Sequence, residues 1–495
     1  MTWSPTPAVA LPVGRTTARL DSAAVEVGDR LLEDLRCACS TVEVDETSRA
    51  EAGRDWWPLA VHWALRGQVP ALPAVVARPS DTEQVAAVLA LCNEARVPVT
   101  PMGGRSGVCG GSVPVFGGVA LDLCGLDGIV GVNTTDLLVD VATGTNGSDL
   151  EESLRVGHGL TVGHWPQSMA LSTVGGWVAC RSAGQYSTRY GKVEDMVEGL
   201  EVVLADGRVI ETGGRAPRSA TGPDLTRCLL GSEGTLGVVT RAVLRAHPTP
   251  PSELRAAYRF ASFDDGLEAC RLTLRRGATP AVLRLYDEAE AARSLASAEA
   301  VTLVALDEGD ASIATATMDV LSQECLAAGG EAADEGLVAH WLATRNEVPS
   351  LGELCATGLV VDTVEVAARW SALAGLYHSG LAALRSVDGT VLASAHQSHT
   401  YPDGACLYFT FAGQPSEPEA YYTAAWDALM RATLAAGATI SHHHGIGLNR
   451  GRWLPDELGE GFAVLGALKG ALDPRGILNP GKLGLPSPWG PPPWP

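Results

Sequence analysis

Three consecutive histidines, His442, His443 and His444, precede a Gly-x-Gly turn in the stretch SHHHGIG. Imidazole changes its charge near neutral pH, so histidines commonly bind metal ions or transfer protons. A zinc site needs three or four converging ligands, but the chain has no His-Glu-x-x-His motif and no Cys-x-x-Cys pair. We therefore expect proton transfer or contact with a developing oxyanion, and no metal. The β-branched stretch ATI before the triplet predicts a strand end, with His442 and His444 on one face and His443 on the other.

Two shorter stretches, AVLRLYD and HQSHTYPDG, hold further candidates. Tyr401 precedes a Pro-Asp-Gly turn, which favours the rim of a pocket, although a lone tyrosine is more often a core residue. His396 and His399 have an odd spacing, so a strand would direct them to opposite faces. Arg284 lies in an apolar run where a buried guanidinium needs an anion, and Asp287 is the simplest partner within the chain.

Three glycine-rich turns could hold a large phosphorylated ligand. They are PMGGRSGVCGG (residues 101–111), PQSMALSTVGGWVACRSAG (166–184) and LLGSEGTLGVVT (229–240). Glycine lets backbone N–H groups approach an anion because no side chain blocks them. None of the turns has the Gly-x-Gly-x-x-Gly register, and no lysine precedes Ser or Thr, so the common nucleotide motifs are absent. Each turn alone could be purely structural, but the three together predict the walls of one long cofactor cleft.

The elements that must position these residues fall into two regions. Residues 74–104 read as a β-α-β unit, with a helix that begins near Ser80 and Asp81. Further strands follow, with a helix capped by Asn146 or Ser148 and a hairpin at an Ala-Asp-Gly turn. After a proline linker at residues 248–251, strands and helices alternate in an order typical of an antiparallel sheet.

Composition limits the classes of partner. The 495 residues carry a formal net charge of −21 without a cluster of Lys and Arg, so we expect no nucleic-acid partner. Only Lys192, Lys469 and Lys482 offer an amine, which disfavours Schiff-base chemistry. Eleven cysteines without a Cys-x-x-Cys pair favour reduced thiols and a cytoplasmic location. We expect no transmembrane segment, and no signal peptide in the N-terminal stretch MTWSPTPAVALPVGRTT, which lacks a basic region.

The order of these motifs resembles the FAD-binding vanillyl-alcohol oxidase superfamily of PCMH-type flavoproteins, with its FAD-linked oxidase C-terminal domain. Within it, the stretches SMALSTVGGWVACRSAG, RSATGPDLTRCLLGSEGTLGVVTRAVLRAHP, YPDGACLYFTF and SHHHGIG resemble alkyldihydroxyacetonephosphate synthases. The resemblance implies non-covalent FAD and an α+β fold: an N-terminal helical segment (1–65), a two-subdomain PCMH-type FAD-binding domain (66–248), an α+β cap domain with an antiparallel sheet that holds the substrate (249–440), and a C-terminal segment with a proline-rich tail that returns to the flavin (441–495).

The same resemblance assigns roles to individual residues. Catalytic roles fall to Arg284, Tyr401 and the histidine triplet. His396 stands where the animal synthases have a substrate-contacting arginine, and imidazole cannot reproduce the two-point grip of a guanidinium on phosphate. Gln167 stands where the synthases usually have Asp. The predicted FAD-binding residues are Pro101, Met102, Gly103, Gly104, Arg105, Ser106, Gly107, Gln167, Ser168, Ser172, Thr173, Cys180, Arg181, Ser182, Ala183, Glu233, Gly234, Thr235, Leu236, Gly237, Val238 and Val239.

Three functions follow from the resemblance. The first is a redox-neutral, FAD-dependent transferase like the synthases, in which an alcohol replaces a carboxylate on the substrate and the triplet and Tyr401 move protons. The second is an FAD-dependent oxidase or dehydrogenase of a 2-hydroxy acid or related alcohol, in which a histidine takes the hydroxyl proton and hydride passes to the flavin. The third is a non-catalytic flavin-binding protein. The expected partner is a small-molecule substrate, and a homodimer is the candidate assembly.

Overall fold

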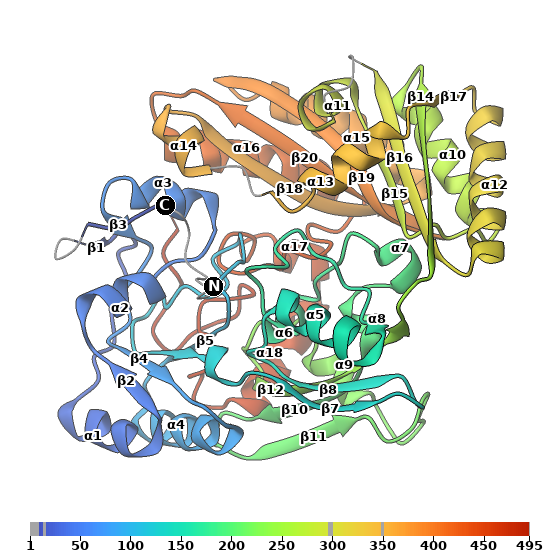
Figure 1. The fold of residues 1–495 in the computed structure, drawn as a ribbon. Helices are drawn as coiled ribbons and strands as arrows, with labels where there is room; N and C mark the ends of the chain where they lie inside the picture. The colour runs from blue at the N-terminus through green and yellow to red at the C-terminus, as the bar shows by residue number, and fades with distance from the viewer. Residues whose placement is uncertain (1–8, 13–15, 296–299, 348–350, 495) are drawn as a thin grey trace.

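The computed structural model describes residues 9–12, 16–295, 300–347 and 351–494. Much of the N-terminal stretch in which we expect no signal peptide lies outside the described residues. The chain forms two lobes (Figure 1): an N-terminal lobe with two main sheets and two short two-stranded ones, and a cap lobe built on one large sheet. The C-terminal segment, red in Figure 1, returns from the cap lobe into the N-terminal lobe. The expected α+β class is confirmed.

The first sheet of the N-terminal lobe has the strand order β2-β4-β6-β5. Strands β4 and β5 both run parallel to β6, as expected for the β-α-β unit. The connecting helix begins after Asp81, whose carboxylate accepts a hydrogen bond from the backbone N–H of Gln84. The region contains β1 (Thr17–Ala18), α1 (Asp29–Ala38), β2 (Thr41–Glu43), α2 (Glu46–Ala52), α3 (Pro58–Ala64), β3 (Gln68–Val69), β4 (Val75–Arg78), α4 (Thr82–Ala95), β5 (Val99–Met102), β6 (Val119–Asp122) and the 3-10 helix η1 (Leu123–Gly125). Residues 1–65 therefore supply a sheet strand as well as helices.

The second sheet of this lobe is antiparallel, with the order β11-β10-β12-β8-β7. The predicted Ala-Asp-Gly hairpin joins β10 to β11, and Asn146, not Ser148, caps α5. The elements are β7 (Ile129–Asn133), β8 (Leu138–Ala142), α5 (Gly147–His158), β9 (Leu160–Thr161), α6 (Val174–Cys180), α7 (Ser187–Tyr190), α8 (Val193–Met196), β10 (Val197–Val203), β11 (Val209–Gly213), α9 (Leu225–Leu229), β12 (Val238–Arg245) and β13 (His247–Pro248).

The cap lobe is a seven-stranded antiparallel sheet in the order β17-β14-β16-β15-β19-β20-β18. Its strands are β14 (Ser252–Phe260), β15 (Val282–Tyr286), β16 (Val301–Gly309), β17 (Glu331–Ala333), β18 (Val360–Arg369), β19 (Thr390–Tyr401) and β20 (Gly404–Gly413). Its helices are α10 (Phe263–Arg275), α11 (Glu288–Ser294), α12 (Ala311–Ala327), α13 (Gly336–Thr344), α14 (Leu351–Ala356), α15 (Trp370–Arg385) and α16 (Pro418–Ala435).

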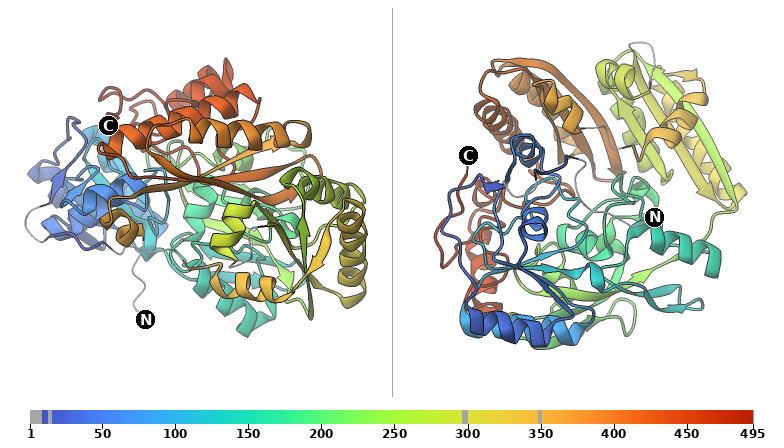
Figure 2. Two further views of the ribbon diagram at one scale, coloured as in Figure 1. Left: turned by 90° about the horizontal axis from the view of Figure 1, so that it is seen from above. Right: turned by 60° about the vertical axis from the view of Figure 1, so that its left-hand side comes forward.

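Strand β15 shows how this sheet divides its two faces. Leu283 and Leu285 join the main core with residues of α10, α12, α15 and α16. Val282 and Tyr286 alternate with them and pack with Tyr186, which belongs to the N-terminal lobe. Arg284 lies two positions from each of them along the strand, so its side chain points to the same face, toward the N-terminal lobe. The outer helices and the inward face of the sheet are visible in Figure 2.

The histidine triplet does not end a strand, so that prediction was wrong. Thr439 forms a single bridge with Ala367, and residues 441–444 then follow an irregular path. The C-terminal segment contains helices α17 (Leu454–Leu458) and α18 (Gly461–Leu472). Beyond them, Leu478 forms an isolated parallel bridge with Val99, the first residue of β5. The alternation of side chains expected along a strand does not apply here, because side-chain hydrogen bonds, and not a sheet ladder, hold the loop.

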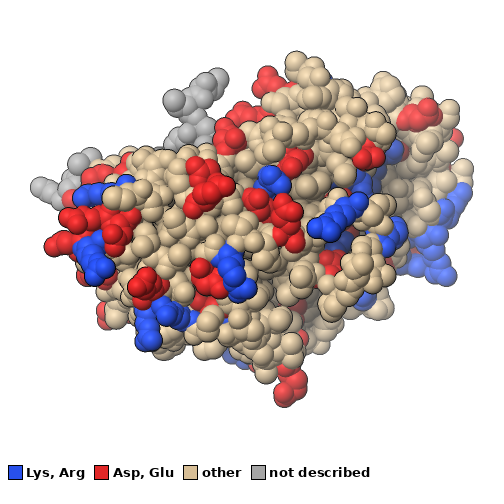
Figure 3. Space-filling model, turned by 90° about the horizontal axis from the view of Figure 1, so that it is seen from below, with Lys and Arg blue, Asp and Glu red and all other residues tan. Residues whose placement is uncertain are grey.

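The surface shows both signs of charge. On the face in Figure 3, acidic and basic side chains are interspersed. Among the residues that the structure describes, no helix combines the length and apolar character needed to cross a bilayer.

Candidate active site

The glycine-rich turns converge. A side chain at Gly103 would meet Thr173 Oγ1 at 2.3 Å, and one at Gly234 would meet Pro101 Cγ at 2.4 Å. The histidine loop joins the same cluster, because a side chain at Gly445 would meet Glu233 Oε1 at 2.7 Å. The three turns and the loop therefore form one continuous wall, as the sequence predicted for a cofactor cleft.

The first turn also has the chemistry of an anion site. Arg105 adopts a left-handed conformation with φ of 51°. Among the described residues, no acceptor faces the backbone N–H groups of Gly104, Arg105, Ser106 or Gly107. Successive free N–H groups in such a turn form a concave binding site for phosphate oxygens. The backbone thus fits the diphosphate of FAD.

Several other predicted cofactor residues use their side chains inside the protein. Arg181 forms an ion pair with Glu194 at 2.8 Å, and Ser182 Oγ lies 2.7 Å from His164 Nε2. Gln167 is exposed and donates to the Glu347 carbonyl at 3.3 Å. Only the backbone atoms of these segments are then left for a cofactor.

A β-bulge arranges the catalytic candidates on β19. His396 pairs with Tyr408 and Ser398 with Cys406, but the next pair is Thr400 with Ala405, so His399 is an extra residue. Its φ is 50°. Contrary to the expectation of opposite faces, His396 and His399 both contact Tyr408. The ring centres of His396 and Tyr408 lie 4.5 Å apart in a stacked arrangement, and His399 Nε2 lies 3.0 Å from the Tyr408 hydroxyl.

Tyr401 and the triplet meet beneath this strand. The Tyr401 hydroxyl lies 3.1 Å from His442 Nε2, and His442 Nδ1 lies 3.0 Å from His443 Nδ1. His443 Nε2 lies 2.8 Å from the hydroxyl of Tyr408, a residue that the sequence did not single out. In the stretch LYFTF, Tyr408 looks like any core aromatic residue, so only the fold reveals its place.

Two buried carboxylates hold the histidine loop. Glu365 is fully buried, accepts hydrogen bonds from the backbone N–H groups of His442 and His444, and forms an ion pair with Arg450 at 3.0 Å. Glu233 accepts from Ile446 and Gly447 at 2.6 and 2.8 Å. Lys192 Nζ donates to the His442 carbonyl at 2.5 Å. These contacts fix the backbone, so the imidazoles are positioned before any ligand binds.

Burial keeps the imidazoles of the site in their neutral form. Burial lowers the pKa of His399, His442 and His443 well below the usual value, and the charge of Lys192 adds to the effect. Burial also lowers the pKa of His444 to about 4. At neutral pH these groups are therefore uncharged and can serve as bases.

Arg284 and His396 are in direct contact. Arg284 Nη2 donates to His396 Nε2 at 2.8 Å, and since a guanidinium has no acceptor, this nitrogen carries no proton. Burial, opposed by the Glu290 contact and reinforced by Arg284, lowers the pKa of His396 to about 4. Asp287, the expected partner of Arg284, instead caps α11. Tyr286 and Ser398 accept two further bonds from Arg284, so among the described residues a second N–H on each Nη is still available to a ligand.

A second arginine, Arg345, lies between the lobes. Arg284 and Arg345 lie 5.6 and 5.5 Å from the ring centre of Trp341, and Arg345 also contacts the rings of Trp165 and Tyr186. Its Nη1 donates to Gln185 Oε1 at 2.9 Å. Neither guanidinium has a carboxylate partner within the described part of the chain.

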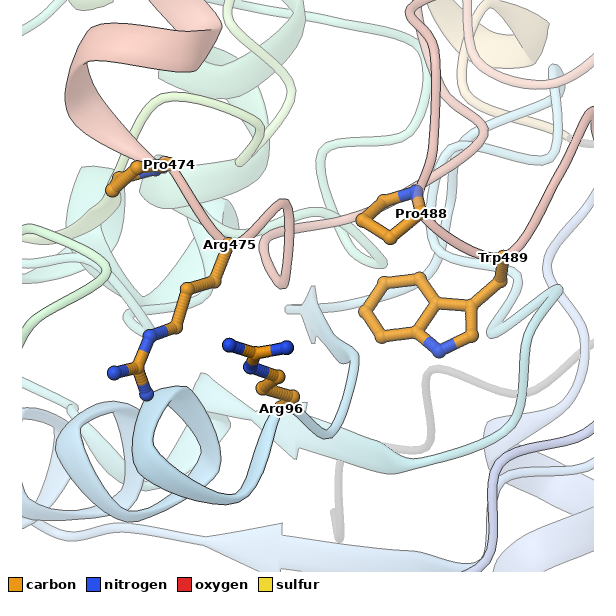
Figure 4. A pocket seen from close by; sticks show the side chains of 5 residues that line it. All are labelled: Arg96, Pro474, Arg475, Pro488 and Trp489. Atoms are coloured by element: carbon orange, nitrogen blue, oxygen red, sulfur yellow. The ribbon is translucent and has the colours of Figure 1, made fainter.

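Two other features were considered as ligand sites. His399, His442 and His443 each place a ring nitrogen within 4.8 Å of the others, a spacing that suits a metal ion, but all six ring nitrogens are engaged in hydrogen bonds. A surface pocket at the end of α4, lined by Arg96, Pro474, Arg475, Pro488 and Trp489, contains none of the catalytic candidates (Figure 4).

Comparison with known proteins matches both lobes. Residues 73–213 match the family described as FAD binding domain, and residues 249–483 match FAD linked oxidases, C-terminal domain. The expected FAD cofactor is thus confirmed at the level of the domain.

Full-length relatives have more than one activity. The chain is 32% identical to the uncharacterized FAD-linked oxidoreductase YgcU of Escherichia coli O157:H7, over 83% of this chain and 89% of that protein. It is 30% identical to the glycolate oxidase subunit GlcD of Bacillus subtilis (84% and 90%) and 28% identical to alkyldihydroxyacetonephosphate synthase of Dictyostelium discoideum (84% and 74%). A solved alkyldihydroxyacetonephosphate synthase superposes with a TM-score of 0.77 at 22% identity, covering 97% of this chain and 89% of that one, which establishes a common fold.

Proposed function

Because this chain belongs to the family of FAD-linked oxidases, we propose that it is an FAD-dependent oxidoreductase that oxidises a small hydroxy acid. The observation that carries the proposal is a pair of cap-lobe arginines at the lobe boundary, Arg284 on β15 and Arg345 after α13. Both contact Trp341, and both lack an acidic partner among the described residues. Both arginines are partly buried, and a partly buried cation without an anion is costly, so an anionic substrate would complete the site.

The charge at this site fits a carboxylate better than a phosphate ester. His396 is neutral and accepts a bond from Arg284, so it adds no positive charge where the synthases are expected to have an arginine. A guanidinium pairs with a carboxylate through two parallel hydrogen bonds. Arg284 and Arg345 would thus orient the acid group and leave the hydroxyl-bearing carbon free to react.

Proton removal falls to the neutral imidazoles. His442 and Tyr401 are hydrogen-bonded to each other, and His442 is uncharged at neutral pH, so it has one unprotonated ring nitrogen that could receive the substrate proton. His444 has no hydrogen-bond partner for Nε2 among the described residues. It is held through its backbone by Glu365, so it is placed to contact the substrate directly. Bound FAD supplies the hydride acceptor.

The test is anaerobic addition of candidate substrates to the FAD-loaded protein. A panel of D-2-hydroxy acids should contain a compound that bleaches the oxidised flavin absorbance, and its methyl ester, which lacks the negative charge, should not. Equal reduction by acid and ester would contradict the role of the arginines. Failure of every hydroxy acid with a flavin that dithionite still reduces would overturn the proposed reaction.

A redox-neutral transfer of the synthase type is the second candidate. It is supported by the contact between Tyr401 and His442 beside three consecutive histidines, in a chain 28% identical to a synthase. With acylated dihydroxyacetone phosphate and a long-chain alcohol, this reaction would release the fatty acid and leave the flavin oxidised when turnover ends. Fatty acid release without net flavin reduction would favour it over hydroxy-acid oxidation.

A further inference from the structure

We propose that six side chains at the lobe boundary form one closed proton relay, and that Ser187 is the positioning residue that closes it. In order around the cycle the members are Tyr401, Ser187, His399, Tyr408, His443 and His442. Five belong to the cap lobe or the C-terminal segment. Ser187, the first residue of α7, is the contribution of the N-terminal lobe.

Every link of the cycle is a hydrogen bond. Ser187 Oγ lies 3.3 Å from the Tyr401 hydroxyl and 2.7 Å from His399 Nδ1. The Tyr408 hydroxyl lies 3.0 Å from His399 Nε2 and 2.8 Å from His443 Nε2. The Nδ1 atoms of His443 and His442 lie 3.0 Å apart, and His442 Nε2 lies 3.1 Å from the Tyr401 hydroxyl. No member is bypassed, so the cycle is complete.

The protons of the cycle balance. Three hydroxyl groups and three neutral imidazoles each carry one transferable proton and one acceptor site, which gives six protons for six bonds. All six bonds are satisfied only when they run in the same direction around the cycle. Two directions satisfy this count. The Tyr401 hydroxyl donates to Ser187 Oγ in the structure, which corresponds to the arrangement with His442 protonated at Nε2 and His443 at Nδ1; the reversed arrangement has His442 protonated at Nδ1 and His443 at Nε2.

The two arrangements interconvert when each member passes one proton to its neighbour. A proton received at Tyr401 or His442 is therefore not confined to one group: the cycle shares it and carries one extra positive charge until the proton returns by the same route. In the rotation itself only O–H and N–H bonds break and form, in equal number, and no proton is gained or lost. This use of the cycle rests on the proposed function, in which a substrate hydroxyl delivers the proton, whereas the cycle itself exists without substrate.

The charged surroundings favour a resting cycle without an extra proton. Lys192 and Arg284 lie close enough to lower the pKa of His399, after the larger effect of burial. Glu365 faces His444, which lies outside the cycle, and also acts on Tyr408 within it. The other titratable groups that face the cycle are Glu194, Asp195, Cys406, His396 and Arg181.

Ser187 can be tested by its effect on residues that it does not touch. In the FAD-loaded protein, the imidazole 15N shifts of His442 and His443 report which nitrogen is protonated. In the wild type we expect values averaged between the two tautomers for all three histidines of the cycle. Ser187→Ala should open the cycle, so His442 and His443 should shift toward single tautomers, whereas Ser187→Thr, which keeps a hydroxyl, should retain the averaged values. Exposed His340 should not change in any variant.

Tyr408→Phe is a second way to open the cycle and covers the case in which Ser187→Ala does not fold. It should move the 15N shift of His442, which does not contact Tyr408. Unchanged His442 shifts in both opened variants would overturn the relay. If a substrate is found, flavin reduction in H2O/D2O mixtures should depend non-linearly on the deuterium fraction in the wild type and linearly in Ser187→Ala. A failure of flavin reduction alone would count against the proposed function and not against the relay.

Discussion

Tyr401 and His396 lie on the same face of β19, although they are an odd number of positions apart in the sequence. Strict alternation would place them on opposite faces. The bulge at His399 shifts the register between Ser398 and Thr400, so Tyr401 pairs with Gly404 on the face where His396 pairs with Tyr408. One inserted residue thus brings a phenol and an imidazole to the same side of the sheet, facing the N-terminal lobe.

The bulge predicts a residue-specific effect on stability. His399→Val should lower the free energy of unfolding by about 1–2 kcal/mol, because a β-branched residue disfavours the left-handed conformation at φ of 50°. His399→Asn, whose side chain tolerates that conformation, is the matched control and should lose less. Urea unfolding measures both, and equal losses in the two variants would argue against strain at the bulge.

Arg345→Met should weaken substrate binding more than it slows catalysis. Loss of a charge-assisted hydrogen bond costs about 1.5–3 kcal/mol, so KM should rise roughly tenfold to hundredfold while kcat stays within a few-fold. Steady-state kinetics with the hydroxy acid identified by flavin bleaching measures this, and exposed Arg259→Met serves as control. A fall in kcat at constant KM would show that Arg345 does not anchor the ground state.

Gly103→Ala should reduce the amount of bound FAD. The new methyl group would lie 2.3 Å from Thr173 Oγ1 and force two walls of the cleft apart. The ratio of flavin to protein after purification measures the effect. Gly157→Ala, where the structure leaves open space for the methyl group, should retain full occupancy. Full flavin content in Gly103→Ala would remove the first turn from the cofactor site.

Glu365→Gln should destabilise the protein strongly. Glu365 and Arg450 are both fully buried, and removing one charge leaves the other without its partner, at a cost of about 3–5 kcal/mol. Chemical denaturation of the variant beside Glu417→Gln, an exposed control, gives the comparison. If the two variants unfold at the same denaturant concentration, the ion pair does not hold the loop.

Stability should fall as the pH drops from about 7 toward 4. The folded pKa of His396 and of His444 is about 4, below the unfolded value of about 6.5, so the unfolded chain binds more protons in this range. Each group contributes a slope of up to about 1.4 kcal/mol per pH unit, and its stabilisation is fully present above the unfolded pKa. His396→Gln should flatten the pH dependence of the unfolding free energy, whereas exposed His340→Gln should not. An unchanged slope in His396→Gln would mean that this histidine is protonated in the folded protein.

Local sequence signals were enough to predict many of the secondary-structure elements and the residue types of the candidate site. Local signals were sufficient for the β-α-β unit, the Asp81 cap, the hairpin and the antiparallel cap sheet, because caps, turns and alternation depend on neighbouring residues. The glycine-rich turns and the resemblance they carry were enough for the FAD-binding domain. The histidine triplet and Tyr401 could be identified by residue type.

The contacts between these elements and the orientation of their side chains could be read only from the tertiary structure. The bulge at His399 and the non-strand path of the histidine loop contradict what spacing predicted, and His396 takes the place of Asp287 as a partner of Arg284. Register, loop path and partner all depend on residues distant in sequence. Ser187, Tyr408, Glu365 and Arg345 carry no local signal, since an isolated serine, aromatic or charged residue looks the same in a core, on a surface or in a site. They acquire their roles when the lobes meet, because buried polar groups must find partners and those partners come from other parts of the chain.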